Sequence, residues 1–586
     1  MRGPPAPPSR FRTVNEALAS AARSDSGLTF VDAHEQEVVL PWREVHARAR
    51  RFASALRAEG VRPGDRVAIV LPTAPSFPDA FFGAVLAGAI PVPLYPPVRL
   101  GRMDEYHRAT ARMLRACGAR LVVTDGRIRF LLGAAVAQAR PELGLRAAAE
   151  LLERGSGQHE LDADPSSLAL IQFSSGSTVD PKPVALTHGN LLSQAAAYHA
   201  LVRQLPGTRE LGVSWLPLYH DMGLIGGLLG GIYYPGPLVL LPPETFLARP
   251  ALWLRTISRF RATISSAPNF AYALCLKRVR DEELEGVDLS SWTYAMNGAE
   301  PVSAEVMRRF AERFAPFGFD PGSLLPVYGL SEASLAVTFC PRRTPLRAVR
   351  LDPQHLARTG QVREGTRPIA SVGAPVPGVE VEIRDEHGAP APERQAGRIW
   401  VRGPSVMRGY FGAEEATAQA IQDGWLDTGD VGFESGGELY VCGRAKDVVI
   451  IRGANHAPQE FEECLEQVEG IRAGCAVALG FVPEPSGSEE LLVLAERADA
   501  AGAVDPTLPD RIRAAIGERM GIRPHTVEIL APGTLPRTSS GKMRRQEALR
   551  RYLAGELAPP KRVTARSVAA EMARGAAALA WSRVRG

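Results

Sequence analysis

A hydroxyl-rich stretch follows the apolar run Leu168–Ile171 and reads Phe173-Ser174-Ser175-Gly176-Ser177-Thr178-Val179-Asp180-Pro181-Lys182. Its small residues let backbone N–H groups approach an anion, its hydroxyl groups add donors, and Lys182 adds positive charge. The stretch therefore predicts a phosphate-binding loop after a buried strand, although a solvated Ser/Gly linker would have the same composition. It is not the G-x-x-x-x-G-K-[ST] pattern of P-loop nucleoside triphosphatases.

Helices and buried strands alternate on the N-terminal side of this loop. Apolar residues recur at helical spacing in Arg43–Glu59, and the apolar runs Val67–Leu71 and Leu121–Thr124 are of strand type. Such alternation favours an α/β fold in which stacked sheets of parallel type are covered by helices.

The 586 residues are too many for one hydrophobic core, so we expect several structural units. Short strands between Gly-rich turns predict a β-rich subdomain at about 370–443, inside a large N-terminal domain over 13–443. A β-α-β-like pattern then predicts a small α+β C-terminal domain over 444–586 that ends in a helical tail; the family resemblance described below implies that this domain is mobile. Residues 1–12 are rich in Pro and Arg, and we expect a disordered lead-in there.

Composition excludes several classes of protein. The formal net charge is +4, and the sequence has no basic block interleaved with aromatic residues, which argues against nucleic-acid binding. The scattered cysteines match no zinc motif. The N-terminus lacks the apolar core of a secretory signal, which predicts a cytoplasmic protein. The uncharged stretch Met222–Leu241 is long enough to span a membrane, but Pro235 and Pro237 would break such a helix.

Four further motifs follow the loop in a fixed order. They are Tyr328-Gly329-Leu330-Ser331-Glu332, Trp425-Leu426-Asp427-Thr428-Gly429-Asp430, Gly443-Arg444-Ala445-Lys446-Asp447 and Pro536-Arg537-Thr538-Ser539-Ser540-Gly541-Lys542. Taken singly, each contains residues that are common on any protein surface. Together with the loop they cover about residues 30–555, and in this order the chain resembles the adenylate-forming superfamily of acyl-CoA synthetases, peptide-synthetase adenylation domains, luciferases and fatty acyl-AMP ligases.

The resemblance implies ATP and Mg²⁺ as cofactors and gives each motif a role. Lys542, His220 and Glu332 are the implied catalytic residues, Glu332 and Thr178 serve the metal ion, and Lys446 is the hinge between the domains. The implied nucleotide-binding residues are Ser174, Ser175, Gly176, Ser177, Thr178, Lys182, Gly298, Ala299, Glu300, Tyr328, Gly329, Ser331, Asp430 and Arg444. Pro183 follows Lys182 where the superfamily usually has Gly, so the loop lacks one backbone donor there.

The chemistry explains why such residues are required. A carboxylate is a poor nucleophile toward a polyanion, so a site that joins the two must neutralise charge on both before in-line attack on the α-phosphorus. Lys542, Lys182 and the metal ion would supply that positive charge.

Several local phrases resemble one branch, the fatty acyl-AMP ligases. They include Trp215-Leu216-Pro217-Leu218-Tyr219-His220-Asp221-Met222-Gly223, Ala267-Pro268-Asn269-Phe270-Ala271-Tyr272 and Asn297-Gly298-Ala299-Glu300-Pro301. The branch implies a fatty acid substrate and transfer of the acyl group to the phosphopantetheine thiol of a carrier protein. Asn269, Phe270, Tyr272 and Met222 are candidates for the acyl pocket, whereas ordinary core packing is the alternative.

The acceptor is less well determined by the sequence than the activation step. Arg342–Arg367 matches the position of an insertion that restricts the use of coenzyme A in this branch, although a surface loop would look the same. A fatty acyl-CoA synthetase would share every catalytic residue. A peptide-synthetase adenylation domain would need an acid near 267–272, which is absent there. A non-catalytic nucleotide- or acyl-binding protein would be expected to lack Lys542 or Glu332. Because no Asp-Ser carrier motif follows residue 560, we expect a separate carrier polypeptide.

Overall fold

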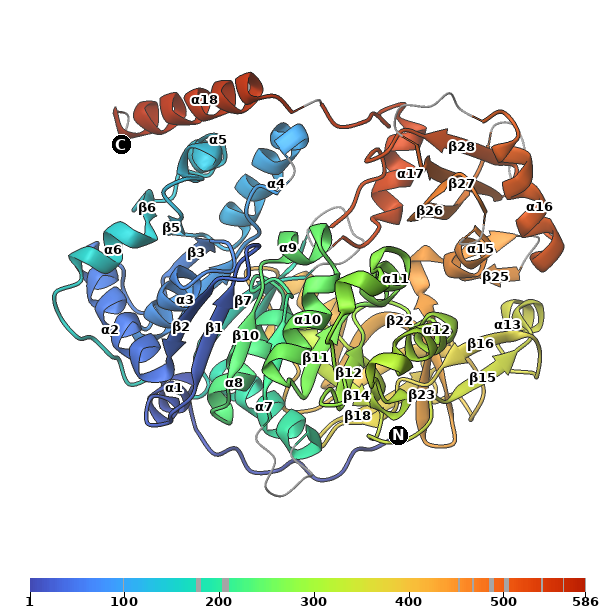
Figure 1. The fold of residues 1–586 in the computed structure, drawn as a ribbon, viewed down its shortest axis with the longest axis horizontal. Coiled ribbons are helices and arrows are strands. Elements are labelled where there is room, and N and C mark those ends of the chain that lie inside the picture. Colours follow the sequence, from blue (N-terminus) through green and yellow to red (C-terminus); the bar gives the residue numbers. More distant parts are fainter. Residues whose placement is uncertain are drawn as a thin grey trace.

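The computed structural model describes residues 1–98, 100–174, 181–202, 210–451, 454–465, 468–483, 489–499, 505–538, 541–561 and 563–584. Four predicted loop residues, Ser175, Gly176, Ser177 and Thr178, lie outside these ranges. The predicted α/β architecture is confirmed: a large N-terminal domain contains parallel sheets and helices, and a smaller domain follows it (Figure 1).

A nine-stranded sheet forms the centre of the large domain. Its strand order is β17-β14-β13-β12-β11-β9-β10-β1-β2. The parallel core strands are β13 (Leu324–Gly329), β12 (Tyr294–Asn297), β11 (Ile264–Ala267), β9 (Gly212–Ser214), β10 (Leu238–Leu240) and β1 (Gly27–Val31). The antiparallel edge strands are β14 (Ala336–Phe339), β17 (Ala374–Pro375) and β2 (Glu37–Pro41). The carboxyl ends of the parallel strands meet at one edge, where ligands bind in open α/β sheets.

A second, four-stranded sheet is parallel throughout. It contains β4 (Ile90–Pro93), β3 (Arg66–Val70), β5 (Leu121–Thr124) and β6 (Leu145–Ala147). Helices α2 (Trp42–Ala58) and α3 (Ser76–Leu86) pack on each other beside it, and the predicted apolar stripe of α2 is buried at Val45, Ala49, Phe52 and Leu56. The helical spacing in the sequence therefore identified the core-facing side of α2.

Two antiparallel units complete the large domain. Strands β7 (Leu168–Phe173) and β8 (Pro183–Thr187) form a hairpin whose outer neighbour is β20 (Gly409–Tyr410). The β-rich unit contains β18 (Glu380–Arg384), β19 (Gly397–Arg402), β21 (Ile421–Gln422), β22 (Trp425–Ser435) and β23 (Glu438–Arg444). These strands lie between residues 380 and 444.

The C-terminal domain follows a short turn, η8 (Ala445–Asp447). It contains the pair β24 (Val449–Ile451) and β25 (Ala454–His456), and the sheet of β26 (Ile471–Phe481), β27 (Glu490–Arg497) and β28 (Thr526–Leu530). Helices α15 (Pro458–Leu465) and α16 (Leu508–Met520) bury one face of the larger sheet, and α17 (Arg545–Leu553) covers the other. The last helix, α18 (Ala565–Val584), leaves this domain and lies beside α5 (Gly133–Ala139) of the large domain (Figure 1).

One sequence expectation differs from the structure, and another agrees with it. The residues expected to form a disordered lead-in are ordered, because the Met1 amino group donates to the Val381 carbonyl at 2.7 Å and Gly3 N–H donates to Val379 at 2.8 Å. The uncharged stretch Met222–Leu241 is divided among the π-helix η3 (Met222–Leu229), α8 (Gly230–Tyr233) and β10. Among the described residues, no helix has the length and apolar character to cross a membrane.

Candidate active site

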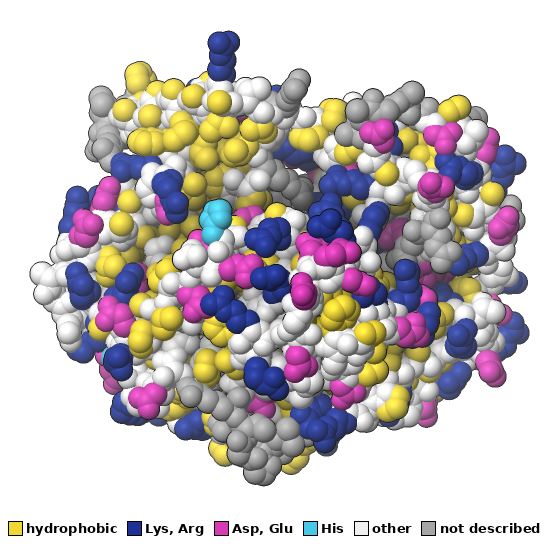
Figure 2. Space-filling model, in the orientation of Figure 1, with side chains coloured by type: hydrophobic (Ala, Val, Ile, Leu, Met, Phe, Trp, Pro, Cys, Tyr) yellow, Lys and Arg dark blue, Asp and Glu magenta, His cyan; other side chains and the backbone are white. Residues whose placement is uncertain are grey.

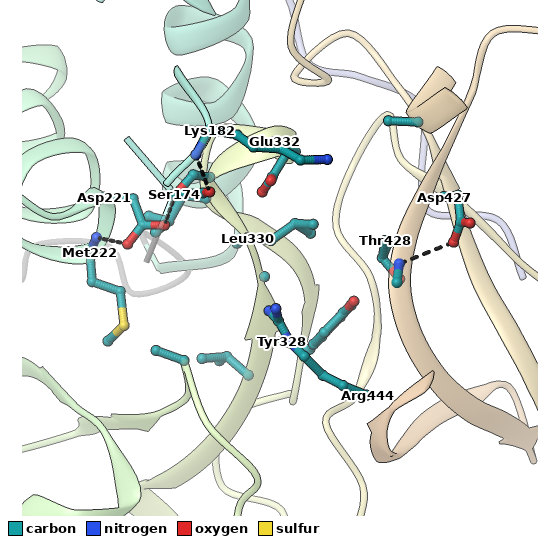
Figure 3. Close-up of a pocket in the computed structure, with 18 of the residues that line it drawn as sticks. Ser174, Lys182, Asp221, Met222, Tyr328, Leu330, Glu332, Asp427, Thr428 and Arg444 are labelled. Atoms are coloured by element: carbon teal, nitrogen blue, oxygen red, sulfur yellow. Dashed lines mark hydrogen bonds between the residues drawn. The ribbon is translucent and has the colours of Figure 1, made fainter. Parts of the chain in front are cut away.

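A cavity of about 370 Å³ opens where the two domains meet. Residues at and after the ends of β12 and β13 form one wall of the cavity, and residues 427–429 of β22 form another. Lys542 reaches in from the C-terminal domain. Figure 3 shows Ser174, Lys182 and Asp221 on one side of this space and Asp427 and Thr428 on the other. The cavity therefore brings together motifs that are far apart in the sequence.

Two hydrogen bonds join Ser174 and Lys182, which lie at the two ends of the predicted phosphate loop and form what we call its neck. Ser174 N–H donates to the Lys182 carbonyl at 3.0 Å, and Lys182 N–H donates to Ser174 Oγ at 3.3 Å. The Lys182 ammonium lies 4.5 Å from the centroid of the Tyr410 ring, a cation–π contact that holds the side chain at the cavity wall. The neck thus presents both a hydroxyl group and a positive charge to the cavity.

Three side chains from three predicted motifs meet opposite this loop. The Tyr328 hydroxyl donates to Asp430 Oδ2 at 2.7 Å, and Arg444 Nε lies 3.3 Å from Asp430 Oδ1. Burial raises the pKa of Asp430, while Arg444 and the Tyr328 hydrogen bond act in the opposite direction. The backbone of β22 at Asp430 is fixed by Thr428, whose Oγ1 accepts the Asp430 N–H at 3.1 Å.

Glu332 faces the cavity from the turn η7 (Ser331–Ala333). Its Oε1 accepts a hydrogen bond from the Tyr410 hydroxyl at 3.1 Å, and burial raises the pKa of the carboxyl group. The neighbouring Ser331 hydroxyl donates to Asp221 Oδ2 at 2.6 Å, while Asp221 Oδ1 accepts the Met222 N–H at 2.8 Å. In the described part of the chain, no cluster of three or more His, Cys, Asp or Glu residues could hold a metal by itself.

Lys542 is presented by a tight turn of the C-terminal domain. Thr538 N–H donates to the Lys542 carbonyl at 2.8 Å, and Lys542 N–H donates back to Thr538 Oγ1 at 3.0 Å. Burial lowers the pKa of the ammonium group, whereas the carboxylates of Asp221, Glu300 and Asp430 counteract this effect. A lysine between these acids places a cation where carboxylate and phosphate groups would approach each other.

Ala299 lines the cavity, and the side chains of Glu300 and His220 interact electrostatically with Lys542. Glu300 Oε1 accepts the Phe270 N–H at 2.6 Å, and burial raises the pKa of Glu300. Ala299 lines the cavity with a positive φ of 68°, which an alanine adopts only when its surroundings impose it. Burial lowers the pKa of His220 to about 4, so its imidazole is neutral at pH 7.

The predicted nucleotide residues that remain lie at strand ends. Gly298 follows β12, and an added Cβ there would lie 2.7 Å from Val327 Cγ2. Gly329 ends β13, where an added Cβ would lie 1.8 Å from the Leu335 carbonyl oxygen. Both positions therefore require glycine for close backbone packing.

Of the four residues predicted for an acyl pocket, Met222 lines the cavity. Phe270 instead packs against Trp215, with ring centroids 5.9 Å apart, and Asn269 Oδ1 accepts the Ser303 N–H at 3.1 Å. Tyr272 is fully buried, and its hydroxyl donates to the Met296 carbonyl at 2.9 Å. An apolar part of the cavity lining, which we call the apolar branch, contains Tyr198, Met222, Gly226, Met296, Val327, Leu335 and Phe339.

Several cavity residues were not selected from the sequence. Asp221 and Asp427 lie inside quoted motifs, so their motifs were the available signal. Tyr410 and Arg398 belong to no quoted motif; Arg398 pairs with Asp427, with Nη2 and Oδ2 2.6 Å apart. Lys446, the predicted hinge residue, also lines the cavity. The arrangement can bind an anionic ligand with a hydroxylated portion near Asp430 and an apolar portion near Met222.

Comparisons with known proteins identify what this chain is similar to. The profile of the AMP-binding enzyme family matches residues 19–411. A Caulobacter vibrioides protein, provisionally named an acyl-CoA synthetase, is 35% identical, and the alignment covers 93% of this chain and 96% of that protein. Long-chain-fatty-acid–AMP ligase FadD32 of Mycolicibacterium smegmatis is 33% identical, and the alignment covers 88% of this chain and 89% of that protein. The medium-chain-fatty-acid–acyl-carrier-protein ligase JamA of Moorena producens is 32% identical, with 90% and 92% covered.

Solved structures agree over nearly the whole chain. One from a study of fatty acyl-adenylate ligases of E. coli and L. pneumophila superposes with a TM-score of 0.87 at 35% identity and covers 94% of this chain and 99% of its own. A fatty acyl-adenylate ligase of L. pneumophila in complex with acyl adenylate and pyrophosphate has a TM-score of 0.71 at 31% identity, with 93% and 96% covered. Both similarities extend across the two domains that form the cavity.

Proposed function

The chain belongs to the AMP-binding enzyme family, and from this premise we propose that it is a fatty acyl-AMP ligase. It joins a fatty acid to AMP from ATP, releases pyrophosphate, and then passes the acyl group to the phosphopantetheine thiol of a separate carrier protein. The relatives named for fatty-acid–AMP and acyl-carrier-protein ligation support both halves of this proposal.

One observation supports the activation step above all others. Lys542 of the C-terminal domain lines the same cavity as Lys182, Glu332 and Tyr328, whose hydroxyl donates to Asp430. A nucleotide whose ribose lies at Asp430 and whose phosphates lie toward Ser174 and Lys182 would have its α-phosphate close to Lys542. The apolar branch at Met222 would then direct a fatty acid's carboxylate to the same point.

Each nucleotide-binding role rests on position in this cavity. Tyr328 and Gly329 would contact the adenine, Asp430 and Arg444 the ribose hydroxyls, and Lys182 the phosphates. The backbone around Gly298, Ala299, Glu300 and Ser331 would enclose the nucleotide from the strand ends. The hydroxyl groups of Ser174, Ser175, Ser177 and Thr178 and the backbone at Gly176 would complete the phosphate loop.

The reaction then proceeds in two steps, formation of the acyl-adenylate and transfer of the acyl group to a thiol. A carboxylate oxygen of the fatty acid forms a bond to the α-phosphorus while the bond to the β-phosphate oxygen breaks, and pyrophosphate leaves. The Lys542 ammonium stabilises charge on the carboxylate and the α-phosphate as this happens. Next, the carrier thiol attacks the acyl carbonyl, AMP departs with the bonding electrons, and the thiol proton is lost to solvent or a base.

Mg²⁺ fits the acidic side chain that the site presents. Glu332 is a half-buried carboxylate facing the cavity, and Mg²⁺ is commonly held by one or two carboxylates together with substrate phosphates. We therefore propose that Glu332 and the Thr178 hydroxyl would hold the ion, which supplies positive charge to the phosphates. His220 is neutral at pH 7 and would donate or accept a hydrogen bond beside the reacting carboxylate.

The acceptor distinguishes this proposal from its rival, a fatty acyl-CoA synthetase. The rival is favoured by the Caulobacter vibrioides relative. The carrier acceptor is favoured by the segment Arg342–Arg367, which contains β15 (Ala348–Leu351) and α13 (Pro353–Thr359) and packs through Leu351 and Leu356 near Phe433. Arg367, the last residue of this segment, donates to Glu460 of the C-terminal domain at 2.9 Å. A segment fixed between the domains would restrict the movement needed to accept coenzyme A.

The six cysteines are free thiols, which fits a reducing compartment, and we propose a cytoplasmic location for this ATP-consuming reaction.

The deciding experiment is ATP–pyrophosphate exchange across a series of fatty acids, followed by acyl transfer to a phosphopantetheinylated carrier or to coenzyme A. Exchange that depends on a fatty acid, with transfer to the carrier, is the expected result. Exchange driven by amino acids, or by no acid at all, would refute the proposal.

A further inference from the structure

A contact between the two domains lies next to the turn that carries Lys542. The large domain contributes η1 (Leu100–Arg102) and the start of α4 (Met103–Ala116). Arg102 Nη2 donates to three main-chain carbonyl oxygens, those of Gly533 at 2.9 Å, Thr534 at 3.2 Å and Ala558 at 3.0 Å. Its side chain is only 13% exposed, so this guanidinium group is enclosed between the domains.

Two of the carbonyl groups bound by Arg102, those of Gly533 and Thr534, lie at the base of the Lys542 turn. Thr534 is buried, and the chain continues through Leu535, whose N–H donates to Glu496 Oε1 at 2.8 Å. Arg544 N–H then returns to the Pro536 carbonyl at 3.0 Å, which closes the turn. A guanidinium group that fixes residues 533 and 534 therefore limits how far Lys542 can move from the cavity.

Glu105 fixes the other end of the same turn. Its carboxylate accepts both terminal nitrogens of Arg551 on α17, at 3.0 and 2.8 Å, and also accepts Arg102 Nη1 at 2.8 Å. Burial raises the pKa of Glu105, but the two arginines outweigh it and hold that pKa below its ordinary value. Since α17 directly follows the turn, the large domain contacts the chain both before and after Lys542.

The segment after α17 adds a second attachment. Lys561 N–H donates to the Gly101 carbonyl at 3.1 Å, and its ammonium lies 3.0 Å from Asp104 Oδ2. Helix α18 then packs on α5 and on η2 (Arg129–Leu132) of the large domain. Figure 2 shows apolar side chains gathered over this region, at the upper left of the molecule.

The docking of α18 is close and specific. A Cβ added to Gly575 would lie 1.7 Å from the Phe130 carbonyl oxygen, so the two backbones touch. Glu571 Oε1 lies 3.7 Å from His107 Nδ1, with both side chains less than 9% exposed, and Met572 packs against the core of the four-stranded sheet. The C-terminal domain is thus attached to the large domain at η8 on one side and through α18 on the other.

We propose that Arg102 is a positioning residue for adenylate formation: with Glu105 it holds the Lys542 turn in the cavity, and α18 keeps the bound segment in place. The inference rests on the proposed function, because it assigns Lys542 to the activation step. Arg102 itself touches neither the cavity lining nor a reacting group. Its effect is on the position of Lys542 and therefore on turnover more than on substrate affinity.

The test compares Arg102→Ala with Arg108→Ala, a change of an exposed arginine on the adjoining helix α4, in the full-length protein. We expect Arg102→Ala to lower kcat for fatty-acid-dependent pyrophosphate exchange about tenfold to a hundredfold with little change in either KM. Acyl transfer from added acyl-adenylate should be unaffected, and Arg102→Lys should recover part of the loss. An unchanged kcat, or an equal loss in Arg108→Ala, would overturn the inference.

A second variant keeps the test decisive if Arg102→Ala does not fold. A chain ending at residue 562 retains Arg102 but lacks α18, and we expect faster amide hydrogen exchange at 533–543 than in the full chain. This measurement requires no turnover, so it still applies if the wild type forms no adenylate, an outcome that would count against the proposed function alone. Equal exchange at 533–543 with and without α18 would overturn the role given to the helix.

Discussion

Lys542 illustrates how the site depends on individual charges. Burial lowers the pKa of its ammonium group, while Asp221, Glu300 and Asp430 favour the charged form and Arg444 opposes it. Only the protonated lysine can neutralise a carboxylate and a phosphate. The acids around the cavity therefore maintain the charge that the reaction uses.

This balance predicts an alkaline limb in the pH dependence of adenylate formation. Because the active form is protonated and the pKa of Lys542 lies below 10.5, activity should fall as pH rises through that lowered value. Lys542→Arg should move the limb to higher pH, since a guanidinium group stays charged, and Lys542→Ala should slow exchange by orders of magnitude at every pH. Pyrophosphate exchange between pH 6 and pH 10.5 measures both effects. A limb at the same pH in Lys542→Arg would assign the titration to another group.

Gly226 predicts a limit on the acyl chain. It lines the apolar branch of the cavity, and an added Cβ would lie 3.0 Å from Leu335 Cδ2. Gly226→Ala should reduce kcat/KM for the longest accepted acid relative to shorter acids about fourfold, the equivalent of one methylene or ~0.8 kcal/mol. Gly227→Ala is the matched control, because its nearest neighbours lie 4.0 Å away. Equal chain-length profiles for the two variants would mean that the acyl chain does not pass Gly226.

The sequence identified residues that lie inside contiguous motifs. Tyr328, Asp430 and Lys542 were selected because each occurs in a recognisable local pattern. In the structure Tyr328 and Lys542 line one cavity, and Asp430 accepts a hydrogen bond from Tyr328. Tyr410 was not, because its role arises from contact with Glu332, 78 positions away. Tyr272 was assigned to an acyl pocket on local aromatic character, but its ring is enclosed by Trp253, Trp292 and Phe310.

At the scale of elements, the stretch Met222–Leu241 shows that hydropathy alone does not determine which structure a segment adopts. Its uncharged composition is the same for a membrane helix and for buried segments of a globular domain. The structure divides it into a π-helix, one turn of α-helix and a strand, because Pro235 and Pro237 end the helix before β10. Met222 and Gly226 in the π-helix both line the cavity, and widened helical turns are frequent at functional sites. Helix periodicity and strand runs predicted the elements around this stretch, but not its local geometry.

Helix α18 gives a prediction that compares one chemical change at two sites. Gly575→Ala places a methyl group 1.7 Å from the Phe130 carbonyl oxygen, so α18 should separate from α5. Gly517→Ala in α16 meets nothing within 4 Å and should stabilise its helix by about 0.5–1 kcal/mol. Limited proteolysis between α17 and α18 should accelerate in Gly575→Ala only. Unchanged protection there would mean that the helices separate slightly without undocking.

At the scale of the whole molecule, the C-terminal domain is held from two directions. On one side, Arg102 and Glu105 contact the Lys542 turn and α17. On the other, the segment Arg342–Arg367 reaches α15 through Arg367 and α16 through Gln354, whose Nε2 donates to the Met520 carbonyl at 3.2 Å. These contacts join residues that are 93 to 446 positions apart, so no local pattern could predict them. The sequence predicted the order of the domains and the position of this segment, and the contacts that fix their orientation come from tertiary packing.

The last prediction concerns the acceptor and follows from Arg367. Its guanidinium group is buried and pairs with Glu460 and Glu463 of α15, so Arg367→Ala removes the charge that attaches the segment to the C-terminal domain. We expect the ratio of acyl-CoA formed to acyl-adenylate formed to rise severalfold, because the domain gains freedom to move. Adenylate formation should change little, since neither the cavity lining nor the Lys542 turn contains Arg367.

Arg363→Ala is the matched control for this prediction. Arg363 lies in the same segment, but it is 63% exposed and pairs with Asp352 of that segment, so its removal leaves the contact between the domains intact. The measurement follows acyl-adenylate, acyl-CoA and acyl-carrier products from one fatty acid in the wild type and both variants. A raised coenzyme A ratio in Arg367→Ala alone would assign acceptor control to this contact. Equal ratios in all three would remove the segment from acceptor choice, and efficient acyl-CoA synthesis by the wild type would favour the acyl-CoA synthetase instead.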